Sequence, residues 1–123
     1  MAKVLVDTNF ILSAVRNKFD FYEALTDAGH SILIPEEVLK EVRAISEFRA
    51  SKKTLDEALL ALKIVNAIIY QKISCPGNDA DDGIRKYLAA HPETLLATMD
   101  KALKKSVRNR KVVIRNRKKI EVQ

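Results

Sequence analysis

Three aspartates stand within four positions of the segment GNDADDGIRKYL, at Asp79, Asp81 and Asp82. Carboxylates gathered at one place supply hard oxygen ligands for a divalent cation, which is one chemistry that such a cluster could perform. The alternative is helix capping, because acidic side chains stabilise the first turn of a helix. One cap requires only one side chain, so capping alone does not explain all three.

Helical geometry divides the three aspartates. The predicted helix over residues 79–90 has an apolar stripe formed by Ala80, Ile84, Tyr87 and Leu88. At 100° per residue, Asp81 falls on the side of this stripe, whereas Asp82 falls nearly opposite and Asp79 lies off it. We therefore expect Asp79 or Asn78 to cap the helix, Asp82 to lie on its surface and Asp81 to point inward. A reciprocal capping contact is the alternative for Asp81.

Three further carboxylates stand where a fold could bring them to the same place. Asp7 follows the apolar segment KVLV and Asp100 follows TLLAT, so both come just after predicted strands. Because the carboxyl ends of parallel strands meet at one edge of a sheet, we expect both there. Glu41 flanks the apolar stripe of the predicted helix over 35–48. Alone, Glu41 has an ordinary interpretation, in which its flexible stem carries the carboxylate to solvent.

Four carboxylates in one cleft would repel one another strongly. A divalent cation that prefers hard oxygen ligands removes this conflict, and Mg²⁺ or Mn²⁺ fits such donors best. His30 and His91 are too few and too scattered for a zinc site, so we expect them to be surface or core residues. The pattern therefore predicts a Mg²⁺ or Mn²⁺ site whose ligands are Asp7, Glu41, Asp81 and Asp100.

Strands and helices are predicted to alternate along the chain. Apolar segments predict strands over residues 3–6, 31–34, 94–98, 111–115 and 119–122. Helical spacing predicts helices that begin near Thr8, Asp20, Pro35 and Asp79, a long one over 55–70 with Thr54 and Glu57 as a capping box, and a short one over 100–107. This alternation predicts an α/β fold, with a parallel sheet sandwiched between helices. The 123 residues fit a single domain.

The composition and charge limit the partners. The chain is 47% hydrophobic, enough for a real core, and its single Cys75 suits a reducing cytoplasm. The apolar stretch within the first ten residues is too short for a signal peptide, and no apolar stretch in the chain is long enough to span a bilayer. Residues 101–123 hold ten Lys or Arg and one Glu, a net charge of +9, whereas residues 1–100 carry −3. This basic segment indicates either a polyanionic partner or a solvated basic face.

Four segments in this order resemble the PIN domain family, the nuclease domain of VapC-type toxins and of ribosomal-RNA-processing endonucleases. These segments are VDTNF at 6–10, PEEVLKEV at 35–42, ADDGI at 80–84 and ATMDKAL at 97–103. The resemblance implies a three-layer α/β/α sandwich with a central, mainly parallel sheet of four or five strands. ADD and MDKALKKSVRNRK look closer to archaeal and eukaryotic rRNA-processing members than to toxins, which often have an aromatic where Leu103 stands.

The resemblance also implies roles for individual residues. Asp7, Asp81 and Asp100 would ligate one or two Mg²⁺ or Mn²⁺ ions, Glu41 would ligate the second metal or orient water, and Asp82 is the alternative ligand if the register shifts by one. Asn9 and Thr98 match polar positions that support the first aspartate or the metal ligands. The expected reaction is phosphodiester hydrolysis of single-stranded RNA. The residues expected to attract its backbone are Lys101, Lys104, Lys105, Arg108 and Arg110.

Protein partners consistent with the resemblance are a second copy of the chain, a cognate antitoxin or ribosome-assembly factors. Two other functions compete with the nuclease. A non-catalytic RNA-binding PIN scaffold would not need intact acids at all four positions. A phosphatase of the haloacid-dehalogenase type would need a second aspartate where Asn9 follows Asp7-Thr8.

Overall fold

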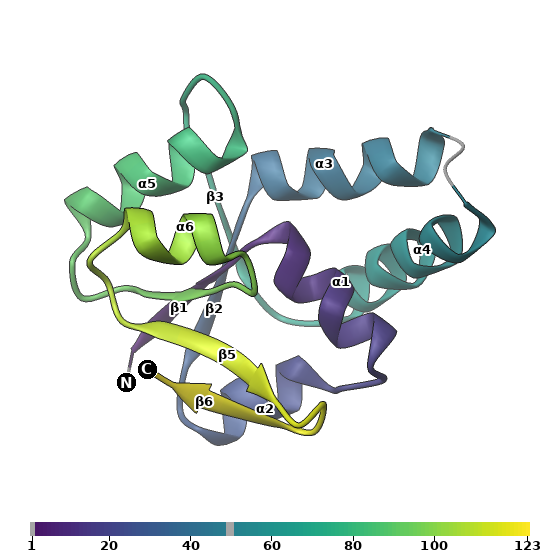
Figure 1. The fold of residues 1–123 in the computed structure, drawn as a ribbon, viewed down its shortest axis with the longest axis horizontal. Coiled ribbons are helices and arrows are strands. Elements are labelled where there is room, and N and C mark those ends of the chain that lie inside the picture. Colours follow the sequence, from purple (N-terminus) through teal and green to yellow (C-terminus); the bar gives the residue numbers. More distant parts are fainter. Residues whose placement is uncertain (1, 49–50) are drawn as a thin grey trace.

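A six-stranded sheet forms the centre of the computed structural model, which describes residues 2–48 and 51–123 (Figure 1). The strands are β1 (Lys3–Val6), β2 (Ser31–Pro35), β3 (Gln71–Ile73), β4 (Leu95–Ala97), β5 (Lys111–Arg115) and β6 (Lys119–Val122). Their order across the sheet is β3-β2-β1-β4-β5-β6, and β5 pairs with β6 in antiparallel fashion whereas the other four pairs are parallel. The predicted mainly parallel sheet is confirmed, with six strands in place of four or five.

Helices connect the strands and cover both faces of the sheet. They are α1 (Thr8–Arg16), α2 (Phe21–Asp27), α3 (Glu36–Glu47), α4 (Lys52–Ala67), α5 (Ala80–Ala90) and α6 (Lys101–Ser106). Helices α1, α3 and α4 pack on one another, and α5 packs on α6. Because crossovers between parallel strands are right-handed, the helices that follow β1 and β2 cover one face, and those that follow β3 and β4 cover the other.

The winding of the chain reverses beside β1. Strand β1 pairs with β2 on one side and with β4 on the other, so the chain leaves the carboxyl ends of β1 and β4 toward opposite faces. Ligands of open α/β sheets bind in the crevice that this arrangement creates. Asp7 directly follows β1, and Asp100 lies three residues beyond β4. The topology therefore brings both carboxylates to the same crevice.

The core explains why these segments fold as they do. Val4, Leu5 and Val6 are fully buried, as expected for a central strand that is covered on both faces. Helix α3 buries Val38, Leu39 and Val42, which fixes the side of that helix that faces the sheet. No helix within residues 2–48 and 51–123 is both long and apolar enough to cross a membrane.

The segment 51–73 differs from its prediction at both ends. Helix α4 begins at Lys52, and Ser51 caps it by accepting a hydrogen bond from the Thr54 N–H at 3.2 Å. Glu57 forms an ion pair with Arg16 of α1 at 3.1 Å, so the predicted capping box is wrong. The helix ends at Ala67, and β3 pairs with β2 in a segment that the sequence did not mark as a strand. Strand β3 lies at the sheet edge with two of its three residues exposed, so it has no apolar pattern that could reveal it.

Candidate active site

Asp7 is the buried centre of the crevice. It caps α1, where Oδ1 accepts a hydrogen bond from the Phe10 N–H at 3.0 Å, and Oδ2 accepts one from the Thr98 hydroxyl at 2.6 Å. Its side chain is only 5% exposed. Burial raises the pKa of Asp7 from 3.8 to about 7; the two hydrogen bonds oppose this rise, and the charges of Asp81 and Asp100 add to it. Asp7 is thus held in one orientation in a place that disfavours its charge.

Asn9 and Thr98 link the ends of β1 and β4. The Asn9 carbonyl Oδ1 accepts from the Met99 N–H at 2.9 Å and lies 3.2 Å from the Thr98 hydroxyl. The Thr98 oxygen in turn accepts from the Asp100 N–H at 3.0 Å. Asp100 caps α6, where its Oδ1 accepts from the Leu103 N–H at 3.0 Å. These bonds give both polar residues a role in fixing Asp7 and Asp100 relative to each other.

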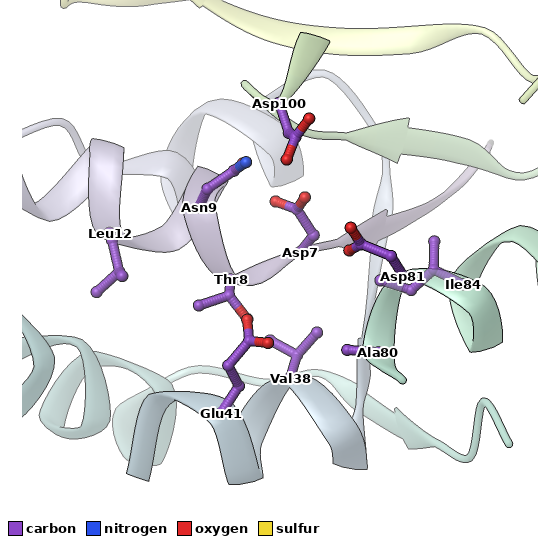
Figure 2. A pocket seen from close by; sticks show the side chains of 10 residues that line it. All are labelled: Asp7, Thr8, Asn9, Leu12, Val38, Glu41, Ala80, Asp81, Ile84 and Asp100. Carbon is purple, nitrogen blue, oxygen red and sulfur yellow. The ribbon is translucent and has the colours of Figure 1, made fainter. Parts of the chain in front are cut away.

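Asp81 and Glu41 approach the same place from two helices. Together with Asp7 and Asp100 they line one cavity of about 220 Å³ (Figure 2). Desolvation raises the pKa of Asp81, the charges of Asp100 and Glu41 raise it further, and Arg85 opposes them. The side chains of Asp81 and Glu41 are exposed, unlike that of Asp7, so they can adjust their positions. The structure therefore brings together all four carboxylates that the sequence singled out.

The other two aspartates of the triplet have local roles. Asp79 caps α5 by accepting from the Asp82 N–H at 2.8 Å. Asp82 accepts from the Asn78 N–H at 2.9 Å and pairs with Lys86 at 3.0 Å. The bond from Asn78 and then the bond from Lys86 lower the pKa of Asp82. The positions of these aspartates thus agree with the predicted helical phase: Asp81 lines the cavity, whereas Asp82 bonds to the segment that precedes α5.

A close contact between a loop and α5 sets the position of Asp81. A Cβ atom on Gly83 would lie 1.9 Å from the carbonyl oxygen of Cys75, so only glycine allows the loop to lie against the helix. Glu37 of α3 holds this loop from the other side, since its Oε1 accepts from the Cys75 N–H at 2.9 Å. The free thiol of Cys75 is buried, and this burial, followed by the charge of Glu37, raises its pKa to about 11. No pattern in the sequence indicates this role for Glu37.

The basic residues expected to bind RNA follow the site in the chain. Lys101, Lys104 and Lys105 lie on α6, whose first residue comes directly after Asp100. Arg108 and Arg110 lie in the connection from α6 to β5 and are exposed. Within the described ranges, none of the five forms an ion pair with a carboxylate. Their charges therefore remain open to a polyanion.

The donor chemistry of the cavity fits a hard divalent cation. Its lining offers carboxylate oxygens, and it contains a buried hydroxyl, that of Thr8, which has no hydrogen-bond partner in the described structure. In the part of the chain described, no three His, Cys, Asp or Glu side chains already form a metal-binding group. A cation would therefore need these carboxylates to draw closer together, and the exposure of Glu41 and Asp81 allows their side chains to move.

Comparison with known proteins agrees with the fold. The sequence matches the PIN like domain family over residues 4–119. The chain therefore belongs to the PIN domain family, whose members are generally nucleases. Among solved structures, that of the PIN domain endonuclease Utp24 superimposes with a TM-score of 0.80 at 27% sequence identity, covering 98% of this chain and 90% of that one.

Curated relatives of two kinds are similar to the chain to nearly the same degree. Ribonuclease VapC4 of Methanocaldococcus jannaschii is 27% identical over 130 residues, covering 99% of this chain and 97% of that protein. The rRNA-processing protein FCF1 homolog of Homo sapiens is 26% identical over 110 residues, covering 85% of this chain and 51% of that protein. The chain thus spans about half the length of the FCF1 relatives.

Proposed function

We propose that this protein is a Mg²⁺- or Mn²⁺-dependent endoribonuclease that hydrolyses phosphodiester bonds in single-stranded RNA. The observation that carries the proposal is the convergence of Asp7, Glu41, Asp81 and Asp100 on one cavity at the switch point of the sheet. An RNA phosphate would be repelled by four carboxylates alone. A cavity of this kind suits a phosphodiester only when a cation lies between the carboxylate oxygens and the phosphate oxygens.

Each carboxylate has a distinct part in this proposal. Asp7, Asp81 and Asp100 would hold one or two cations, and Glu41 would hold the second or orient water. A bound cation lowers the pKa of its water and stabilises charge on the scissile phosphate. Thr98 and the Phe10 N–H keep both Asp7 oxygens in place before any substrate arrives. No histidine is required as a general base.

The basic residues of α6 and the connection that follows it would attract the RNA backbone. Phosphate contacts of this kind bind without reading the sequence and weaken as salt rises. The chain has three Tyr, four Phe and no Trp, so base stacking contributes little. Replacing both Lys104 and Lys105 by Ala should weaken RNA binding uniformly across sequences and reduce the slope of log K against log salt by about 1 to 2.

The biological role within this activity is rRNA processing or that of a VapC-type toxin. The similarity to FCF1 and Utp24 supports the first role, with ribosome-assembly factors as partners. The similarity to VapC4 supports the second, with an antitoxin as partner and a homodimer as one assembly. The buried free thiol of Cys75 suits a cytoplasmic location for either role. An antitoxin gene beside this one would favour the toxin.

Cleavage of single-stranded RNA by the wild type and by Asp7→Asn, with Mn²⁺ and with EDTA, tests the proposal. We expect the wild type to cleave only with Mn²⁺ or Mg²⁺ and the variant to lose cleavage while it stays folded. Equal cleavage by the two, in preparations cleared of contaminating nucleases, would favour the alternative function, a non-catalytic RNA-binding scaffold in ribosome assembly.

A further inference from the structure

Thr8 is buried at the rim of the active-site cavity with an unused hydroxyl. Its side chain is only 7% exposed, and within the described residues its Oγ1 has no hydrogen-bond partner. A buried polar group without a partner destabilises the folded state, so most such groups in proteins are paired. Asp7 and Asn9, its two neighbours in the chain, both bond to Thr98. Thr8 is thus the unsatisfied member of the segment that builds the site.

Glu41 is an acceptor on the same cavity that no side chain of the described residues pairs with. It lies on an exposed part of α3, and in residues 2–48 and 51–123 its carboxylate makes no ion pair within 4.0 Å. Thr8 and Glu41 line the same cavity, and Figure 2 shows the Thr8 hydroxyl and the Glu41 carboxylate pointing toward one another. The exposed Glu41 side chain can move, so a rotation toward Thr8 would bring an acceptor to the Thr8 donor.

We propose that Thr8 is a positioning residue that donates its hydroxyl hydrogen to the Glu41 carboxylate when the site is loaded, and so holds that carboxylate at the cation and its water. The inference rests on the proposed function, because it assigns Glu41 a place at the metal. Glu41 needs such a partner more than Asp7 or Asp100 does, since each of those is already fixed by a helix-capping bond. A neutral hydroxyl gives orientation to one carboxylate without adding charge to a cavity that needs to bind a cation.

Thr8→Val separates this role from a purely structural one. Valine has nearly the same shape, so the variant removes the donor and leaves the packing intact. Loss of an unpaired buried hydroxyl should leave the melting temperature of the metal-free protein unchanged or higher. In contrast, the kcat for RNA cleavage and the apparent affinity for Mn²⁺, taken from the midpoint of the thermal shift, should each fall by about tenfold or more. The KM for RNA should change little, and Thr8→Ser should restore both quantities.

A double-mutant cycle shows whether Thr8 acts through Glu41. The four proteins are the wild type, Thr8→Val, Glu41→Ala and the double variant, and the Mn²⁺ midpoint is measured for each. We expect Thr8→Val to shift the midpoint in the wild-type background and to have almost no effect once Glu41 is Ala, because the partner is gone. Glu47→Ala, on the exposed end of the same helix, and Thr26→Val, on α2, are the matched controls.

Each outcome bears on the inference separately from the proposed function. A Thr8→Val protein that binds Mn²⁺ and cleaves like the wild type overturns the inference while the nuclease stands. An equal effect of Thr8→Val in both Glu41 backgrounds also overturns it. If the wild type binds Mn²⁺ without cleaving RNA, the proposed function fails and the midpoints of the cycle still decide the inference. If Thr8→Val does not fold, Thr8→Ala takes its place in the cycle.

Discussion

Replacing Asp7 by Asn should stabilise the metal-free protein at neutral and alkaline pH although it removes the central carboxylate of the site. Burial raises the pKa of Asp7 from 3.8 to about 7, so the folded protein holds this proton more tightly than the unfolded chain does. At about 1.4 kcal/mol for each tenfold change in ionisation, the difference corresponds to roughly 4 kcal/mol. Relaxation of the folded protein around the charge lowers this value, and we expect about 2 to 4 kcal/mol.

The sign of the pH dependence follows from the raised pKa. The stability that the protonated carboxyl contributes is fully present below the unfolded pKa, near 4, and is lost as pH rises to and beyond about 7. Asparagine stays neutral throughout. It can also keep both native bonds, because its oxygen can accept from the Phe10 N–H while its amide donates to Thr98, whose hydroxyl hydrogen can turn to Asn9 at 3.2 Å.

Urea unfolding of the wild type and Asp7→Asn at pH 4, 6 and 8, in the presence of EDTA, measures this effect. The two proteins should have similar free energies of unfolding at pH 4, and the variant should gain most of its advantage between about pH 4 and 7. If the difference in free energy of unfolding did not change with pH, or if the variant were less stable than the wild type at pH 8, burial of Asp7 would not destabilise its charged form as argued. Addition of Mn²⁺ at pH 8 should stabilise the wild type and reverse the order.

The remaining predictions concern the metal and the first turn of α5. Millimolar Mn²⁺ at pH 7, at matched ionic strength, should raise the melting temperature of the wild type, and an unchanged curve would argue against a metal site. Asp81→Asn should lose RNA cleavage as fully as Asp7→Asn, whereas Asp82→Asn should keep most of it; the opposite result would mean that Asp82 is the ligand. Asp79→Asn should be nearly silent, with a change in stability of roughly a few tenths of a kcal/mol by urea unfolding, because Asn caps about as well as Asp. Gly83→Ala should cost roughly 1 to 3 kcal/mol and reduce cleavage, because its new methyl group would force the Cys75 loop away.

Much of the fold could be predicted because its signals are local. The strand KVLV and the cap at Asp79 both depend on residues within one or two turns, and the structure has them as expected. The helical phase that separates Asp81 from Asp82 also needs only the spacing of neighbouring apolar residues. Strand β3 gave no local signal, because its only reason to be extended is the backbone pairing with β2.

The sequence by itself determined which carboxylates exist, which of them follow strands and which side of each helix they occupy, because backbone geometry fixes these relations over a few residues. Only the tertiary structure decided that Asp7 is the buried one, with a pKa near 7, because burial depends on strands and helices distant in the chain. It also decided that Glu37 supports a loop and that Thr8 keeps an unused hydroxyl facing Glu41. Both depend on side chains that meet across elements, and no spacing within the sequence encodes that meeting.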